Sequence, residues 1–235
     1  MEDMHFITIL GLGFLLGARH ALDADHLVAV STILCRYRDP RAPGFIGFCW
    51  GFGHTVVLLV VGCAVIVLKV TIPEPLALAL EFAVGVMLVV LGASLAYTIW
   101  RERWHLHAHQ HAGEVHLHLH SHGFESDHAH GHWIRYSLQP VLIGMVHGLA
   151  GSAALMLMLL STVRTLWEGM AYILMFGLGS MLGMMVLGVL ISLPLMLSVS
   201  VGRRAHLAVQ GLASIGSIGF GLAMMLTIGH EAHLF

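Results

Sequence analysis

Six apolar stretches, each long enough to cross a lipid bilayer, constrain what this chain can fold into. They lie at about 6–35, 45–70, 76–100, 138–162, 169–199 and 206–229. A membrane-spanning helix needs about 20 apolar residues. Only 10% of the residues are charged, whereas soluble domains have about 25%. The sequence therefore predicts an all-α membrane protein with about six transmembrane helices.

Basic residues between the stretches predict the orientation. The loops after the first, third and fifth stretches contain most of them: Arg36, Arg38, Arg41, Arg101, Arg103, Arg135, Arg203 and Arg204. Lys69 and Arg164 lie in the loops on the other side. Cytoplasmic loops have the excess of Lys and Arg, so the loops after the first, third and fifth stretches should face the cytoplasm. We expect a multi-pass protein of the cell's inner membrane. Both termini should face outside, and the loop after the third stretch should be cytoplasmic.

The two halves of the chain resemble each other. Residues 17–34 align with residues 144–162, which places His20 over His147. Farther along, "GFGHTV" aligns with "GLGSML", which places His54 over Ser180. Each half has three spans, so the second copy must be inverted in the membrane. Inverted repeats are typical of transporters whose site lies near the midplane, between interrupted helices. Chance similarity between glycine-rich membrane helices is the alternative.

This similarity divides the chain into three parts. Residues 1–104 form the first three-helix repeat, and residues 136–235 form the second. Residues 105–135 form the loop between them.

The first apolar stretch contains five ionisable side chains within "GARHALDADHL", residues 17–27. A charge at the bilayer centre costs about 3 kcal/mol, so these side chains must face the protein interior and have partners. An ion pair between Arg19 and Asp23, four residues apart, is the purely structural interpretation. It leaves His20, Asp25 and His26 unexplained, and imidazole with carboxylate is a ligand set for divalent transition metals.

Helix geometry limits this metal site. His20 and His26 would lie about 9 Å apart along the axis of a regular helix. A single ion cannot take both imidazoles at that separation, because metal–nitrogen bonds are about 2 Å long. Either the helix unwinds in this segment or the ion occupies two successive positions.

Further candidate ligands are isolated histidines in other spans. His54 and His147 each lie in an apolar run, where a hydrogen-bonded packing role is the alternative to metal ligation. Glu81 is interpreted as interfacial or paired. The full set of candidate metal ligands is His20, Asp23, Asp25, His26, His54 and His147, with Arg19 and Ser180 supporting them from outside the coordination shell.

These residues resemble a known family. "RHALDADH" resembles the H-x4-D-H signature of the nickel/cobalt transporter family, with His20, Asp25 and His26 in the signature positions. "GHTVV" at 53–57 resembles that family's second motif. The resemblance implies high-affinity passage of Ni²⁺, with Co²⁺ as a second ion. Residues 137–163 contain no carboxylate, unlike the longer members, and so resemble the short, six-span permeases linked to urease or hydrogenase.

The loop between the halves contains eleven of the nineteen histidines. They are His105, His107, His109, His111, His116, His118, His120, His122, His128, His130 and His132. No apolar periodicity supports a fold, so we expect a disordered segment. Tracts of this kind bind Ni²⁺ and Co²⁺ with little selectivity, so we expect an auxiliary metal-buffering loop. A solvated spacer is the alternative.

The sequence as a whole predicts a permease for Ni²⁺ or Co²⁺, not an enzyme. The metal is a transported substrate rather than a cofactor, the other partner is the lipid bilayer, and a net charge of −2 gives no indication of nucleic acid. Uptake is the first hypothesis, because an inside-negative potential favours arrival of a +2 ion by about 4.6 kcal/mol per 100 mV. Efflux that confers metal resistance and metal-assisted hydrolysis by a membrane enzyme are the rivals. The oligomeric state is left open.

Overall fold

A computed structural model describes residues 2–37, 42–102, 106–111, 114–119, 137–151 and 165–232. Apart from one hairpin, its elements are helices. In chain order they are α1 (Glu2–His20), α2 (Ala24–Leu34), α3 (Ala42–Leu68), α4 (Glu74–Glu102), β1 (Leu106–His111), β2 (Glu114–Leu119), a helix at 137–151, α6 (Leu166–Val201) and α7 (Arg203–Glu231).

Long apolar helices confirm that the chain is an all-α, multi-pass membrane protein. Helices α3, α4, α6 and α7 are each long and apolar enough to cross a bilayer. Helices α1 and α2 meet this criterion together, as a pair bent by 55° at a short break. The described residues thus contain four spans, or five with the bent pair. The expected span at 138–162 is described only as far as residue 151.

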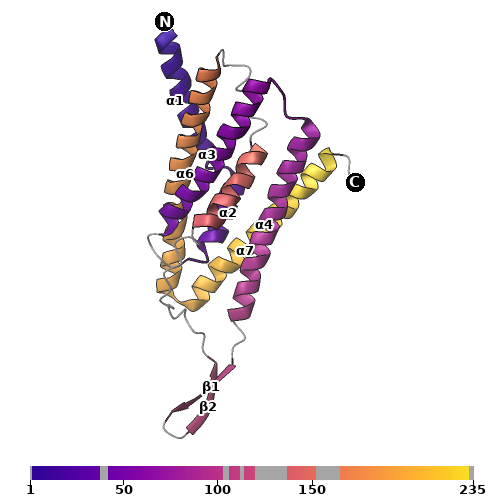
Figure 1. Cartoon of the computed structure of the whole chain (residues 1–235). Helices are drawn as coiled ribbons and strands as arrows, with labels where there is room; N and C mark the ends of the chain where they lie inside the picture. Colours follow the sequence, from indigo (N-terminus) through magenta and orange to yellow (C-terminus); the bar gives the residue numbers. More distant parts are fainter. Residues whose placement is uncertain are drawn as a thin grey trace.

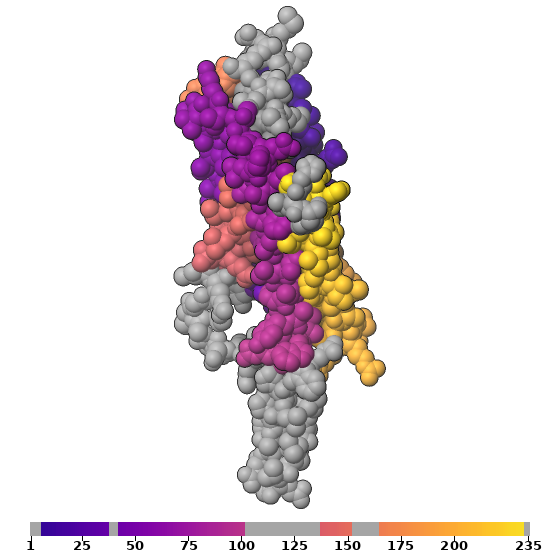
Figure 2. Space-filling view, turned by 90° about the vertical axis from the view of Figure 1, so that its right-hand side faces the viewer, coloured from indigo at the N-terminus to yellow at the C-terminus, as the bar shows by residue number. Residues whose placement is uncertain are grey.

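The helices pack in two groups. Helix α6 packs against both α3 and α1, whereas α4 packs along α7. Figures 1 and 2 show α4 and α7 side by side from two directions. Helix α1 runs parallel to α6, since Gly13 lies against Tyr172 and Gly17 against Phe176. Helix α2 contacts α4, α6 and α7, and so joins the two groups.

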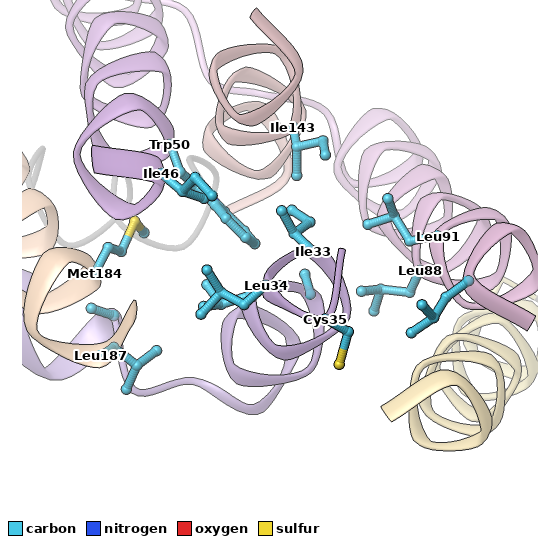
Figure 3. Close-up of a cluster of buried hydrophobic side chains, with 14 of the residues drawn as sticks. Ile33, Leu34, Cys35, Ile46, Trp50, Leu88, Leu91, Ile143, Met184 and Leu187 are labelled. Atoms are coloured by element: carbon cyan, nitrogen blue, oxygen red, sulfur yellow. The ribbon is translucent and has the colours of Figure 1, made fainter. Parts of the chain in front are cut away.

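Apolar side chains surround α2 and fix its position. Figure 3 shows side chains from α3, α4, α6 and the 137–151 helix converging on α2. The fully buried members include Ile33, Ile46, Trp50, Leu88 and Met184. The charged segment that precedes α2 therefore lies next to a dry, close-packed layer.

The ends of the chain and the hairpin lie at opposite ends of the molecule (Figure 1). Strands β1 and β2 pair antiparallel, from Leu106 opposite Leu119 to His111 opposite Glu114. These twelve residues thus differ from the disordered loop that we expected. The physical reason is the alternation in "HLHAHQH" and "EVHLHL", which has the two-residue period of a strand. Residues 120–136 lie outside the described part.

Candidate metal centre

The break between α1 and α2 creates the centre. Helix α1 ends at His20, and Asp23 precedes α2 with an extended backbone (φ −62°, ψ 147°). The last turn of α1 closes with hydrogen bonds from the Leu22 amide to the Arg19 carbonyl and from the Asp23 amide to the His20 carbonyl. Of the two expected arrangements, the structure has the unwound helix. The ring centroids of His20 and His26 consequently lie 4.8 Å apart.

Four imidazoles from different elements converge at this break. The His54 ring, from the middle of α3, lies 5.3 Å from His20 and 5.7 Å from His26 between centroids. The His147 ring, from the 137–151 helix, lies 4.8 Å from His26. One ring nitrogen each of His20, His26 and His54 can be chosen so that all three lie within 4.8 Å of one another. This spacing suits ligands that surround one ion after a small contraction.

The two aspartates of the segment have different roles. Asp25 Oδ1 accepts a hydrogen bond from the His26 backbone amide at 2.9 Å and lies 3.1 Å from His26 Nδ1. Asp25 Oδ2 lies 3.6 Å from His147 Nε2, so this carboxylate lies between two imidazoles. Asp23 Oδ2 lies 2.7 Å from His20 Nδ1, and the Asp23 side chain is 54% exposed. Asp25 lies among the rings, whereas Asp23 lies at the exposed rim, where its carboxylate is still within 4.8 Å of possible ligand atoms of Asp25 and His26.

Arg19 does not take the place that the ion-pair interpretation gave it. Within the described part of the chain, the ion-pair partner of Asp23 is His20 rather than Arg19. Arg19 is exposed and lines the pocket described below. The physical reason is the break, which ends α1 one residue after Arg19 and removes the four-residue helical spacing to Asp23.

Several buried ring nitrogens have no hydrogen-bond partner among the described residues. They are His26 Nε2 and both ring nitrogens of His54 and of His147, and His54 is fully buried. A buried polar atom without a partner costs about 1–3 kcal/mol. A neutral imidazole nitrogen is a good ligand for Ni²⁺ and Co²⁺. The donor set of buried imidazoles and one half-buried carboxylate, that of Asp25, therefore fits a divalent transition metal.

Aromatic rings and a hydroxyl enclose the centre. The Trp50 indole, fully buried, lies 5.1 Å from His147 and 5.9 Å from His26 between centroids. Ser180 Oγ donates to the Gly17 carbonyl at 3.0 Å and so ties α6 to the turn that precedes His20. This agrees with a supporting role for Ser180. Trp50 was missed from the sequence, although it lies four residues before His54 and so on the same helix face.

A pocket of about 500 Å³ leads to the centre. Its polar lining consists of Arg19, His20, Asp23, Asp25, His26, Glu81, His147 and Tyr172. His54 lies behind the pocket rather than on its wall. Glu81, which the sequence suggested was interfacial or paired, is a member of this lining. The histidines of the loop, from His105 to His132, have side chains outside the described part.

Comparison with known sequences identifies the family. Residues 6–200 match the NicO family of high-affinity nickel-transport proteins, which is most of the chain. The chain belongs to the NicO family. Its class is therefore membrane transport of nickel, not catalysis, as the sequence predicted.

Two curated relatives agree with this NicO assignment. The chain is 38% identical over 237 residues to the urease accessory protein UreH of Bacillus sp. (strain TB-90), covering 100% of this chain and 98% of the relative. It is 35% identical over 66 residues to the high-affinity nickel transport protein of Cupriavidus necator (strain H16), covering 28% of this chain and 19% of that relative. No solved structure matches.

Proposed function

We propose that this NicO protein is an uptake permease for Ni²⁺, with Co²⁺ as a second substrate, in the cell's inner membrane. The transport site consists of His20, Asp25, His26, His54 and His147. The observation that carries the proposal is the convergence of buried imidazoles beside Asp25 at a break in a membrane helix, with ring nitrogens that have no hydrogen-bond partner among the described residues. This arrangement would give the ion its ligands and the imidazoles their missing partner.

The charges near the centre suit a +2 ion. Asp25 supplies one negative charge among the rings of the centre, and Asp23 supplies a second at the rim of the centre. The imidazoles add donors without adding charge, which avoids the cost of a further buried carboxylate. Intrinsic affinity for such ligands rises from Co²⁺ through Ni²⁺ to Cu²⁺. Selectivity therefore has to come from the fixed geometry of the four rings.

The fold of this site is, in our proposal, an inverted repeat of two three-helix halves. Glycine contacts support it. A Cβ atom at Gly53 would overlap the carbonyl of Val141, and a Cβ atom at Gly179 would overlap the carbonyl of Phe14. In the alignment of the halves, Gly53 corresponds to Gly179. Extending the two aligned segments toward the N-terminus without a gap pairs Phe14 with Val141 and Trp50 with Phe176. The two contacts are thus the same contact, made once by each half.

A second pair of contacts has the same symmetry. A Cβ atom at Gly17 would overlap the Phe176 carbonyl, and one at Gly144 would overlap the Trp50 carbonyl. Gly17 aligns with Gly144, and Trp50 with Phe176. Repeated backbone contacts of this kind are not expected from chance similarity between glycine-rich helices.

Orientation and direction complete the proposal. Both chain ends lie opposite the hairpin (Figure 1), which agrees with termini outside and a cytoplasmic loop. An inside-negative potential favours uptake of a divalent cation. The full-length similarity to a urease accessory protein supports delivery of nickel to a metalloenzyme inside the cell. Efflux is the alternative direction.

Accumulation of radioactive nickel in intact cells that lack their own nickel permease tests this function. Cells with the protein should accumulate more nickel than cells without it, and His54→Ala should return accumulation to background. His230→Ala, at the exposed end of α7, is the control and should behave as wild type. Both variants must reach the membrane at wild-type levels. Accumulation below that of cells without the protein would show efflux, and unchanged transport by His54→Ala would refute the site.

A further inference from the structure

Glu81 is an acidic residue inside a membrane span that the transport site does not use. It lies seven residues after α4 begins at Glu74, which is about 10 Å along the helix axis. It lines the same pocket as Asp23, Asp25 and His26. Because α4 belongs to the α4–α7 pair and α1 packs on α6, Glu81 approaches this pocket from a different helix group.

Nothing in the described part of the chain neutralises Glu81. No hydrogen bond or basic partner holds its half-buried carboxylate there, and the charges that act on it are those of Glu231 and Asp25, both acidic. An ionisable side chain in a membrane span is costly and usually marks an ion pathway. Three carboxylates, those of Asp23, Asp25 and Glu81, line the pocket against one guanidinium, that of Arg19. The lining is therefore net negative, which favours a cation in the pocket.

The pocket has room for an ion that still holds its water. Six waters at about 30 Å³ each take about 180 Å³, well below the pocket volume of about 500 Å³. His54 does not line this pocket, so an ion has to leave the pocket to reach all four imidazoles. Glu81 and three of the four imidazoles line the same pocket, and only the His54 ring lies outside its lining. An ion beside Glu81 therefore has to move deeper before all four rings can bind it.

We infer that Glu81 is a second cation-binding station, which captures the hydrated divalent ion at the pocket before the ion loses water to the imidazoles. This inference rests on the proposed transport function. A single carboxylate replaces at most one or two waters, through one or both of its oxygens. Glu81 therefore raises the local ion concentration without selecting the metal. It therefore sets the apparent affinity of transport, while the histidine cluster sets whether transport occurs.

Concentration-dependent Ni²⁺ uptake by the full chain in intact cells tests this division of roles. Glu81→Gln should raise KM about 10-fold, the low end of the effect of focusing charge in a cleft, and should leave the maximal rate per membrane protein within about 2-fold. Glu81→Asp, which keeps the charge, should stay near wild type. Glu74→Gln is the matched control, because Glu74 lies on the same helix but lines a different pocket. Its KM should not change.

Met224→Lys provides a test that does not depend on the folding of Glu81→Gln. Met224 lines the same pocket from α7, and a positive charge there should also raise KM, whereas Met224→Gln should not. An unchanged KM in Glu81→Gln or Met224→Lys overturns the inference. So does loss of transport by Glu81→Gln at every concentration, which would make Glu81 part of the transport site.

His54→Ala in the same assay separates a failure of the proposed transport function from a failure of the inference about Glu81. If wild type shows no His54-dependent uptake, the transport function itself has failed and this inference falls with it. If His54 is required but Glu81→Gln has the wild-type KM, only the inference about Glu81 fails.

Discussion

Asp23 and Asp25 lie two residues apart, yet the structure gives them unequal importance for nickel transport. Asp25 lies between His26 and His147 with both oxygens engaged. Asp23 is half exposed, and its carboxylate lies 2.7 Å from His20 Nδ1. An amide oxygen at position 23 can still accept a hydrogen bond from the His20 ring, whereas an amide at position 25 removes the negative charge from the interior of the centre.

We therefore predict that Asp25→Asn abolishes Ni²⁺ uptake, with at least a 100-fold loss of maximal rate divided by KM, while Asp23→Asn loses less than about 10-fold. A missing buried charge costs several kcal/mol, and 1.4 kcal/mol corresponds to a factor of ten. Initial rates of nickel uptake over a range of concentrations measure both. Equal losses in the two variants would show that Asp23 is itself a ligand.

The residue types of the site could be predicted from the sequence, but their arrangement could not. His20, Asp23, Asp25 and His26 stand out because charge is expensive inside an apolar span. His54 and His147 stand out as isolated histidines in the apolar runs of other spans, and the internal similarity places His147 over His20. The Asp25–His147 contact was not accessible, because it depends on where the 137–151 helix packs. The place of Glu81 on the pocket wall was not accessible either, because it depends on the packing of α4.

At the scale of the helices, the break after His20 is the feature on which the site depends. Helical spacing predicted that an unbroken helix could not bring His20 and His26 to one ion, but it left two solutions open. The structure selects the break, since apolar packing of Ile33 and Leu34 fixes α2 while Gly17 fits α1 tightly against α6. Tertiary contacts of this kind have no local sequence signal.

Glycine-to-alanine changes should have opposite effects on thermal stability at open positions and at close helix contacts. Alanine stabilises a helix by about 1 kcal/mol relative to glycine, so Gly216→Ala, with nothing within 4 Å of the added Cβ, should preserve or raise the unfolding temperature. Gly53→Ala and Gly179→Ala should each lower it, because overpacking costs about 1–3 kcal/mol. Thermal unfolding of the purified protein in detergent measures all three. A lower unfolding temperature in only one of Gly53→Ala and Gly179→Ala would argue against equivalent contacts in the two halves.

At the scale of the whole molecule, the two helix groups and their joining helix suggest how the site changes its exposure. Helix α2 contacts both groups, with a dry apolar layer around it (Figure 3). The pocket approaches the centre from the end of α4 that begins at Glu74. Movement of the α4–α7 pair relative to α1, α3 and α6 would therefore alter access to His26 and Asp25 most directly.

Which face of the membrane this pocket opens to depends on the orientation, and cysteine labelling in intact cells decides it. Thr71, after α3, and Ser200, near the end of α6, are exposed hydroxyl residues that each lie at the C-terminal end of their helix. Helices α3 and α6 run antiparallel, since Gly44 lies against Val189 and Gly177 against Thr55, so the two residues lie on opposite sides of the molecule. In a variant without Cys35, Cys49 and Cys63, Thr71→Cys should react with a membrane-impermeant thiol reagent, because the positive-inside rule places that loop outside.

Ser200→Cys should react only after the cells are permeabilised, because Arg203 and Arg204 follow it on the cytoplasmic side. The two substitutions are matched in size and polarity, so a difference in labelling reports the side of the membrane rather than the chemistry of the site. Labelling of Ser200→Cys but not of Thr71→Cys in intact cells would show that the protein has the reverse orientation in the membrane. The pocket with Glu81 would then open to the cytoplasm, and capture of the ion there would favour efflux over uptake.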